Sequence, residues 1–136
     1  MLLCLSALYS AAEMAITSTN KTRMEVIAAE HPFLKDFVSW VNKDRFKAIS
    51  GILIGNNLVN IAASSVATAL ATLIFQSHGV AYAVLVMSVL IIIFGEVLPK
   101  CVAMAKGEKL LMFVLPVVRI TSWLFTPCIW FMTTLV

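Results

Sequence analysis

The chain has 136 residues, of which 61% are hydrophobic and only 12% charged, and its mean hydropathy is +0.98. A soluble domain carries about 25% charged residues, so this composition excludes an ordinary soluble fold and predicts a helical membrane domain. The net charge of +3 is small and dispersed, which leaves no basic patch for nucleic acid. Cys4, Cys101 and Cys128 lie far apart, without the spacing of metal ligands or of a disulfide framework.

The first apolar segment covers residues 1–19 and is interrupted only by small polar residues and Glu13. No basic residue precedes it, which argues against a signal peptide, so we interpret it as the first spanning helix. Residues 21–47 carry six basic and four acidic side chains. Because Lys and Arg accumulate in cytoplasmic loops, this segment is predicted to be cytoplasmic and the N-terminus to lie outside.

A juxtamembrane helical segment is expected over residues 22–46, with a new helix starting at Pro32. Apolar residues then recur at helical spacing: Phe33, Leu34, Phe37, Val38, Trp40 and Val41. This pattern predicts an amphipathic helix, which lies either on the inner membrane surface or against an attached soluble domain.

A run of 48 residues from Ala48 to Gly95 contains no Asp, Glu, Lys or Arg. The run is too long for one span, and Gln76-Ser77-His78-Gly79 divides it into a hairpin with spans at 48–75 and 80–105. Gly51 and Gly55, four residues apart, indicate close packing of the first of these helices against its neighbours. His78 is expected to be a solvated turn residue.

Residues 108–136 are apolar, but Pro116, Arg119 and Pro127 argue against a simple fourth span. Trp123 and Trp130 are typical of the membrane interface. We therefore expect a bent, membrane-embedded interfacial helix here. The predicted fold class is an all-α membrane protein with three transmembrane helices plus amphipathic juxtamembrane and interfacial helices.

Glu96 follows the charge-free run, and a carboxylate within a membrane usually lines a polar pathway or has a partner. At ~1.5 Å per residue, counting from the cytoplasmic ends places Ser10, Asn56 and Glu96 about 15 Å deep, near mid-membrane. Asn60 lies one turn beyond Asn56 and points to the same side of its helix. Three helices thus bring oxygen-bearing side chains to one level.

Pro99 removes the helical hydrogen bond to the carbonyl of Gly95, and so frees a backbone oxygen beside Glu96. Because all these ligands are oxygens, a hard cation is favoured over a soft metal. Magnesium (Mg2+), which takes about six oxygen ligands, fits one carboxylate with neutral oxygens, and sodium (Na+) is acceptable on charge grounds. The predicted cation site comprises Ser10, Asn56, Asn60, Gly95 and Glu96, with Glu13, Asn57, Pro99 and Lys100 as secondary candidates.

Each of these groups also has a purely structural explanation. The three asparagines, Asn57 included, could join helices by hydrogen bonds, and Ser10 could bond to its own backbone. Glu96 could pair with Lys100, four residues on, which is the most serious rival to ion binding. Glu13 could line an inner vestibule or, slightly favoured, bond to neighbouring helices. No enzyme is predicted, because no nucleophile, base and metal occur together.

Three motifs carry a resemblance: Tyr-Ser-Ala-Ala-Glu-Met-Ala at 9–15, Ile-Gly-Asn-Asn-Leu-Val-Asn-Ile at 54–61 and Phe-Gly-Glu-Val-Leu-Pro-Lys at 94–100. With them the chain resembles the transmembrane domain of the CNNM/CorC family of magnesium transporters. Ala12 and Met14 stand where that family usually has Ser and Thr, so no side-chain role is carried over to these two positions.

The resemblance implies a homodimer of three-span subunits in the lipid bilayer, which exports magnesium in exchange for inward sodium. It implies an ion site that falls on Ser10, Asn56, Asn60 and Glu96. It also implies cytosolic CBS domains that bind ATP in the full-length protein; none lies in this chain, so no nucleotide site is expected here. The protein would lie in a bacterial inner or plasma membrane, with its C-terminus in the cytoplasm. The alternative, from another class, is a membrane anchor and dimerisation module without transport activity.

Overall fold

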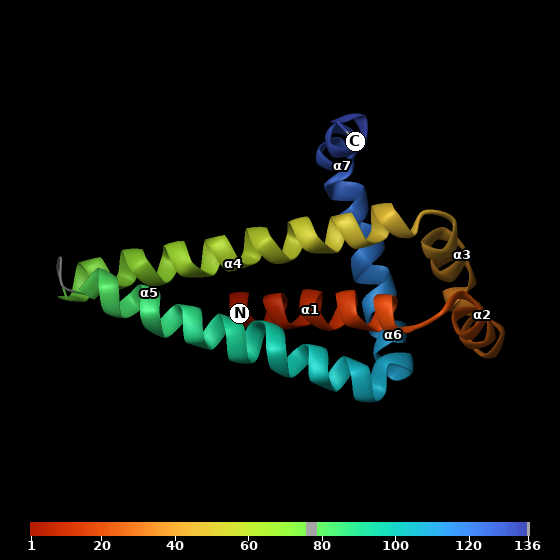
Figure 1. The fold of residues 1–136 in the computed structure, drawn as a ribbon, viewed down its shortest axis with the longest axis horizontal. Coiled ribbons are helices and arrows are strands. Elements are labelled where there is room, and N and C mark those ends of the chain that lie inside the picture. The colour runs from red at the N-terminus through yellow and green to blue at the C-terminus, as the bar shows by residue number, and fades with distance from the viewer. Residues whose placement is uncertain (76–78, 136) are drawn as a thin grey trace.

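The computed structural model describes residues 1–75 and 79–135, which are almost entirely helical and contain no strand (Figure 1). In chain order the elements are α1 (Leu2–Ser18), α2 (Lys21–Glu30), the 3₁₀ turn η1 (Pro32–Leu34), α3 (Lys35–Lys43), α4 (Arg45–Phe75), α5 (Gly79–Leu90), the π-helix η3 (Ile91–Val97), α6 (Leu98–Leu124) and α7 (Thr126–Leu135). The all-α fold class is confirmed.

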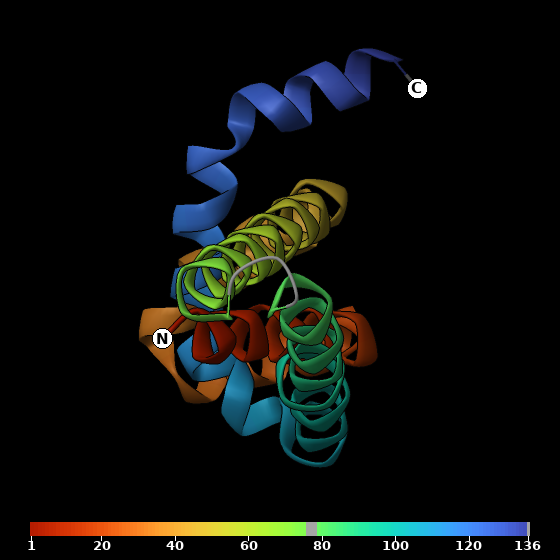
Figure 2. The same cartoon turned by 90° about the vertical axis from the view of Figure 1, so that its left-hand side faces the viewer.

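The helices α4 and α5 form a long hairpin, and α1 packs against the half of the hairpin that lies away from its tip (Figure 1). Viewed end-on, α1 lies beside both arms of the hairpin, where it contacts α4, η3 and α6 (Figure 2). The side of α1 that faces these helices carries mostly small residues, and Ser6, Ala12 and Ala15 are almost fully buried. Small side chains let three helices approach α1 closely.

By length and composition, α4 and the continuous α5–η3–α6 segment can each cross a membrane, and α1 with α2, bent by 109°, makes a third candidate in the described chain. The segment α5–η3–α6 is broken at Lys106, which has non-helical backbone angles (φ −130°, ψ 26°). The observed helices α1, α4 and α5–η3–α6 up to this break lie within three residues of the expected spans. Of the expected turn Gln76-Ser77-His78-Gly79, residues 76–78 lie outside the described residues.

The juxtamembrane segment is a pair of short helices, α2 and α3, joined by η1. Asn20 caps α2 by accepting a hydrogen bond from the Arg23 amide at 2.8 Å, and Pro32 begins η1 at the predicted break. On the second helix Val38 and Val41 are buried, and Phe37 lies under the Arg119 guanidinium, 5.2 Å from the ring centre. The predicted amphipathic face therefore packs partly on α6.

Beyond Lys106, α6 runs across the bundle and α7 projects from it at an angle (Figures 1 and 2). Pro116 lies inside α6 without ending it, and the second bend follows at Phe125 (φ −94°, ψ 11°). The bent helix expected over 108–136 is thus observed as two helices. Its depth in the bilayer stays a prediction.

The predicted close packing of α4 occurs where this helix crosses α6 and α1. A Cβ atom at Gly51 would lie 2.5 Å from Ser122 Oγ on α6, and one at Gly55 would lie 2.8 Å from the Tyr9 ring on α1. Real Cβ atoms do not approach other atoms so closely. The two glycines therefore let α4 touch both neighbours, and they set the spacing of the helices that carry the candidate site.

Candidate cation site

The hydroxyl of Ser6 on α1 lies at the meeting point of three elements. Its Oγ atom is 2.6 Å from Asn60 Oδ1 and 3.2 Å from Asn56 Oδ1, both on α4. The same atom is 3.5 Å from the carbonyl oxygen of Gly95 in η3. Ser6 is fully buried and Asn56 is 7% exposed, so this polar contact is shielded by the surrounding helices.

Asn60 joins this group to the carboxylate of Glu96. Its side-chain oxygen accepts from Ser6, and its Nδ2 atom donates to Glu96 Oε1 at 3.3 Å. Glu96 is partly buried at the edge of the group. Four of the five predicted site residues, Asn56, Asn60, Gly95 and Glu96, thus lie together in the structure, and their role as ligands stays a prediction.

Ser10, the fifth predicted residue, makes none of these contacts. It is fully buried one turn further along α1, and its hydroxyl has no hydrogen-bond partner. In this structure Ser6 supplies the α1 hydroxyl that contacts the asparagines and Gly95, while the role of Ser10 as a ligand stays a prediction. The sequence analysis missed Ser6 because counting residues fixes depth only to about one turn. Ser6 could have been found from its position four residues before Ser10, on the same face of the helix.

The backbone around Glu96 is a π-helix rather than an α-helix with one missing bond. Over Ile91–Val97 the turn widens, and the Leu98 amide donates to the carbonyl of Ile93, five residues earlier. Pro99 follows this π-helix within the continuous segment, and its missing amide proton leaves a carbonyl of the preceding turn without a helical partner. Sequence analysis thus found the place where the α-helical ladder is broken but not the form of the break. Single π-turns are frequent at functional sites.

Gly95 is required by the close approach of α1. A Cβ atom at this position would lie 2.8 Å from Ser6 Oγ, closer than packed atoms allow. The absence of a side chain also leaves the carbonyl oxygen of Gly95 within reach of the serine. Gly95 therefore contributes both its oxygen and the space for Ser6.

Lys100 does not pair with Glu96, which removes the predicted rival to ion binding in this structure. Its Nζ atom lies 3.1 Å from Glu13 Oε2 on α1, and the two side chains are 36% and 24% exposed. Glu13 thus has the inter-helix role that the sequence analysis favoured. Since Glu13 and Lys100 follow the site residues of their own helices in the direction of the basic loops, the pair lies on the predicted cytoplasmic side of the site.

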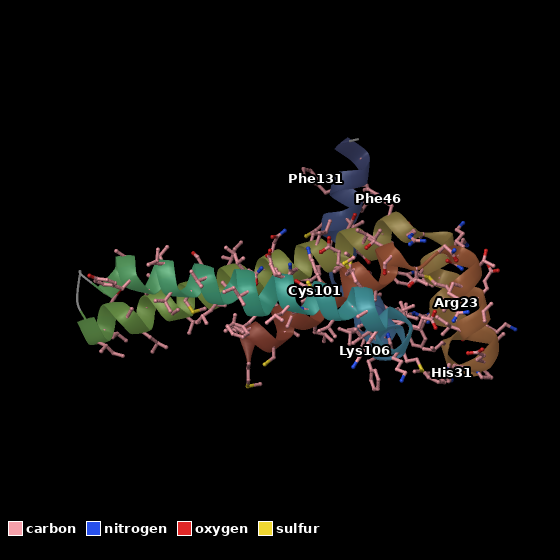
Figure 3. The ribbon with its side chains drawn as sticks, turned by 60° about the horizontal axis from the view of Figure 1, so that its bottom comes forward. Arg23, His31, Phe46, Cys101, Lys106 and Phe131 are labelled. Carbon is pink, nitrogen blue, oxygen red and sulfur yellow. The ribbon has the colours of Figure 1, made fainter. Side chains whose placement is uncertain are left out.

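That end of the bundle carries a second ion pair. Arg23 on α2 donates from Nε and Nη2 to both carboxylate oxygens of Glu108, at 2.6 and 2.8 Å. Figure 3 shows Arg23 and Lys106 at this end, far from the tip of the hairpin. Arg45 donates to the carbonyls of Ile16 and Thr19, and so ties the start of α4 to the end of α1. The charged groups hold the helix ends together and leave Glu96 deeper in the bundle.

Among residues 1–75 and 79–135, no three His, Cys, Asp or Glu side chains lie close enough to hold a metal. A cation at this site would therefore be held by one carboxylate and by neutral oxygens. The remaining candidate, Asn57, is exposed on α4 and lines a groove beside Asn60 and Glu96. It makes no contact with the buried hydroxyl of Ser6.

Comparison with known proteins gives consistent matches along the chain. A family model described as the cyclin M transmembrane N-terminal domain matches residues 1–136. A UPF0053 protein of Haemophilus influenzae is 32% identical over 130 residues, or 96% of this chain and 31% of that protein. The UPF0053 inner membrane protein YfjD of Escherichia coli is 34% identical over 105 residues, or 77% of this chain and 24% of that protein.

A chloroplastic DUF21 domain-containing protein of Arabidopsis thaliana is 37% identical over 123 residues, or 90% of this chain and 18% of that protein. The chain therefore spans less than a third of the length of these relatives. The fold and the apolar helices define an integral membrane protein. The chain belongs to the CNNM (DUF21) family of transmembrane domains, which is associated with membrane proteins of the magnesium and cobalt transporter family.

Proposed function

We propose that this domain transports magnesium and that the ion is bound, during transport, by oxygens of Ser6, Asn56, Asn60, Gly95 and Glu96. The observation that supports this is an excess of acceptors around one donor. The Ser6 hydroxyl has a single proton, and three acceptor oxygens lie within 3.5 Å of it. The proton can point at only one of them at a time.

A cation stabilises such a group, because it can be coordinated by the lone pairs of several oxygens at once. With the Glu96 carboxylate the group offers one negative charge and at least four neutral oxygens, which suits a hard cation. Magnesium is preferred here because the family is associated with magnesium and cobalt transport and the ligand set holds no nitrogen or sulfur. For the resident ion we expect ligand distances of about 2.1 Å, with water completing the shell.

The test is a thermal-shift titration with magnesium chloride on purified protein and on the Glu96→Gln variant. The wild type should gain stability with rising magnesium, and the variant should lose this gain while remaining folded, because the amide has no charge to offer. Glu25→Gln is the matched control, since it removes one exposed carboxylate on α2, outside the site. Equal magnesium responses in wild type and Glu96→Gln would refute the proposed site.

We further propose that magnesium leaves the cytoplasm in exchange for inward sodium, as the resemblance to the family implies. In proteoliposomes, magnesium flux should then depend on an opposing sodium gradient. Equal flux with and without the gradient would favour a uniporter or channel. Absence of any flux, with magnesium binding also absent, would favour the alternative of a membrane anchor for a regulatory domain.

The proposal extends to assembly and location. The working unit is a homodimer in a bacterial inner or plasma membrane, with the N-terminus outside and the C-terminus cytoplasmic. In the full-length protein, cytosolic CBS domains follow. The inner-membrane name of the Escherichia coli relative supports the location, and the basic residues of the α2–α3 region support the orientation. Light scattering in detergent tests the homodimer. Labelling of single cysteines in the loops tests the orientation.

A further inference from the structure

A polar groove runs along the hairpin beside the candidate cation site. It lies between α4 and the α5–η3 arm, and its volume is about 450 Å³. Its lining comprises Asn57, Asn60, Ile61, Ser64, Ser65, Ser88, Ile91, Ile92 and Glu96. Six of these nine residues are polar, although the hairpin around them is otherwise strongly apolar. Asn60 and Glu96 belong both to this groove and to the group around Ser6.

The hydroxyls of the groove lie on one side of the site. Because α4 runs from the basic end toward the hairpin tip, Ser64 and Ser65 come one turn beyond Asn60 in the direction of the tip (Figure 1). The α5 helix returns from the tip, so Ser88 precedes Glu96 on that same side. The groove therefore extends away from the Glu13–Lys100 ion pair, toward the predicted outer face.

The hydroxyl oxygen of Ser88 is able to coordinate a cation in the groove although its proton is already used. Its Oγ atom donates to the Val84 carbonyl at 2.7 Å, which uses the proton and leaves oxygen lone pairs available. Ser65 and Ser88 are both exposed, one on each arm of the hairpin. Oxygens on both walls are the arrangement that replaces part of an ion's water shell along a pathway.

From this geometry we propose that the groove is the route by which the cation passes between its site and the outer side of the membrane. Ser64, Ser65 and Ser88 supply oxygens to a partly hydrated ion, and Asn60 and Glu96 mark the inner end of the route. The identity of the ion rests on the proposed function. The presence of water in the groove does not, which allows the two proposals to fail separately.

The test uses single cysteines and a charged thiol reagent. The three native cysteines, all exposed and free, are first replaced by alanine: Cys4, Cys101 and Cys128. Ser65→Cys and Ser88→Cys then place a thiol in the groove. Val66→Cys and Val89→Cys are the matched controls, because these neighbouring valines are 51% and 49% exposed but do not line the groove. Gel filtration in detergent checks that every variant is folded.

A membrane-impermeant, cationic methanethiosulfonate is added to the outside of spheroplasts that contain the protein. Because a thiolate in contact with water attacks the sulfur of such a reagent and displaces methanesulfinate, the groove cysteines should react at least ~10-fold faster than the controls. Saturating magnesium chloride should slow the reaction, and Glu96→Gln should abolish this protection. Equal rates in groove and control variants, as a dry or dimer-covered groove would give, would overturn the proposal.

Fast labelling that magnesium does not slow, in a protein whose wild-type thermal shift still responds to magnesium, would also overturn the route while leaving the site intact. A magnesium response that survives Glu96→Gln refutes the proposed site instead. The preference of the reagent for the groove cysteines over the valine controls is measured independently of that result.

Discussion

Lys100 forms an ion pair with Glu13 on α1, at 3.1 Å, although Glu96 lies one helical turn before it in its own chain segment. The pair therefore joins two helices and leaves the Glu96 carboxylate to Asn60. A lysine bound to Glu96 would neutralise the carboxylate charge that the proposed cation needs. The position of Lys100 thus separates a structural ion pair from the candidate site.

Breaking this pair should cost stability without weakening magnesium binding. Glu13→Gln leaves the Lys100 ammonium without its partner, and because both side chains are only partly exposed we expect a loss of about 1–2 kcal/mol. Combining Glu13→Gln with Lys100→Met should recover part of that loss in a double-mutant cycle followed by thermal unfolding. A drop in magnesium affinity in the Glu13→Gln variant would instead place this carboxylate in the site.

The two serines of α1 offer a matched comparison. Ser6→Ala removes a hydroxyl that contacts both asparagines, so magnesium affinity should fall about tenfold, the effect of roughly 1.4 kcal/mol. Ser10→Ala removes a buried hydroxyl without a partner and should leave stability unchanged or slightly higher. Isothermal titration and thermal unfolding measure both. A greater affinity loss in Ser10→Ala would restore the ligand set predicted from the sequence.

Gly51→Ala should destabilise the fold strongly. The new Cβ atom would lie 2.5 Å from Ser122 Oγ and 2.9 Å from Ser122 Cα, so the backbones of α4 and α6 must separate. Overpacking of this kind costs about 1–3 kcal/mol. Gly107→Ala is the control, since its Cβ atom meets nothing closer than 3.8 Å. Equal melting temperatures for the two variants would show that α4 and α6 are not in tight contact.

Gly95→Ala should affect the site more than the fold. Its Cβ atom would meet Ser6 Oγ at 2.8 Å and push that side chain away from the asparagines. Magnesium affinity should fall at least as far as in Ser6→Ala, by about tenfold or more. In a Ser6→Ala background the remaining stability cost should shrink, because the clashing oxygen is gone. A stability cost that does not change would point to a backbone effect of Gly95 instead.

The sequence predicted the helices well because charge marks their ends. The absence of charged residues from Ala48 to Gly95, and the basic residues on either side, nearly define α4 and the arm that returns from the tip. The same markers allowed depth to be counted, which placed Asn56 and Glu96 at one level, and helical spacing added Asn60. Helix ends and residue depths both depend only on the distance along the helix axis, which can be counted from the sequence.

The features that the sequence analysis missed depend on how each helix is rotated about its own axis and on which of two possible partners a side chain contacts. Ser6 and Ser10 share one face of α1, and only the packing of α1 against α4 determines which hydroxyl meets the asparagines. Lys100 can reach a carboxylate on its own helix or one on α1, and helical spacing does not distinguish them. The π-turn has no periodic sequence signal, so Gly95 and Pro99 indicated a break without its geometry.

The helix α4 is longer than the hydrocarbon core is thick. At ~1.5 Å per residue its 31 residues measure roughly 46 Å, against a hydrocarbon thickness of ~30 Å. Hydrophobic mismatch therefore favours a tilted α4, and longer lipid chains relax this tilt. Lipid chain length is thereby coupled to the angle of α4 in the bilayer, and so to the position of Asn60 relative to Ser6 on α1.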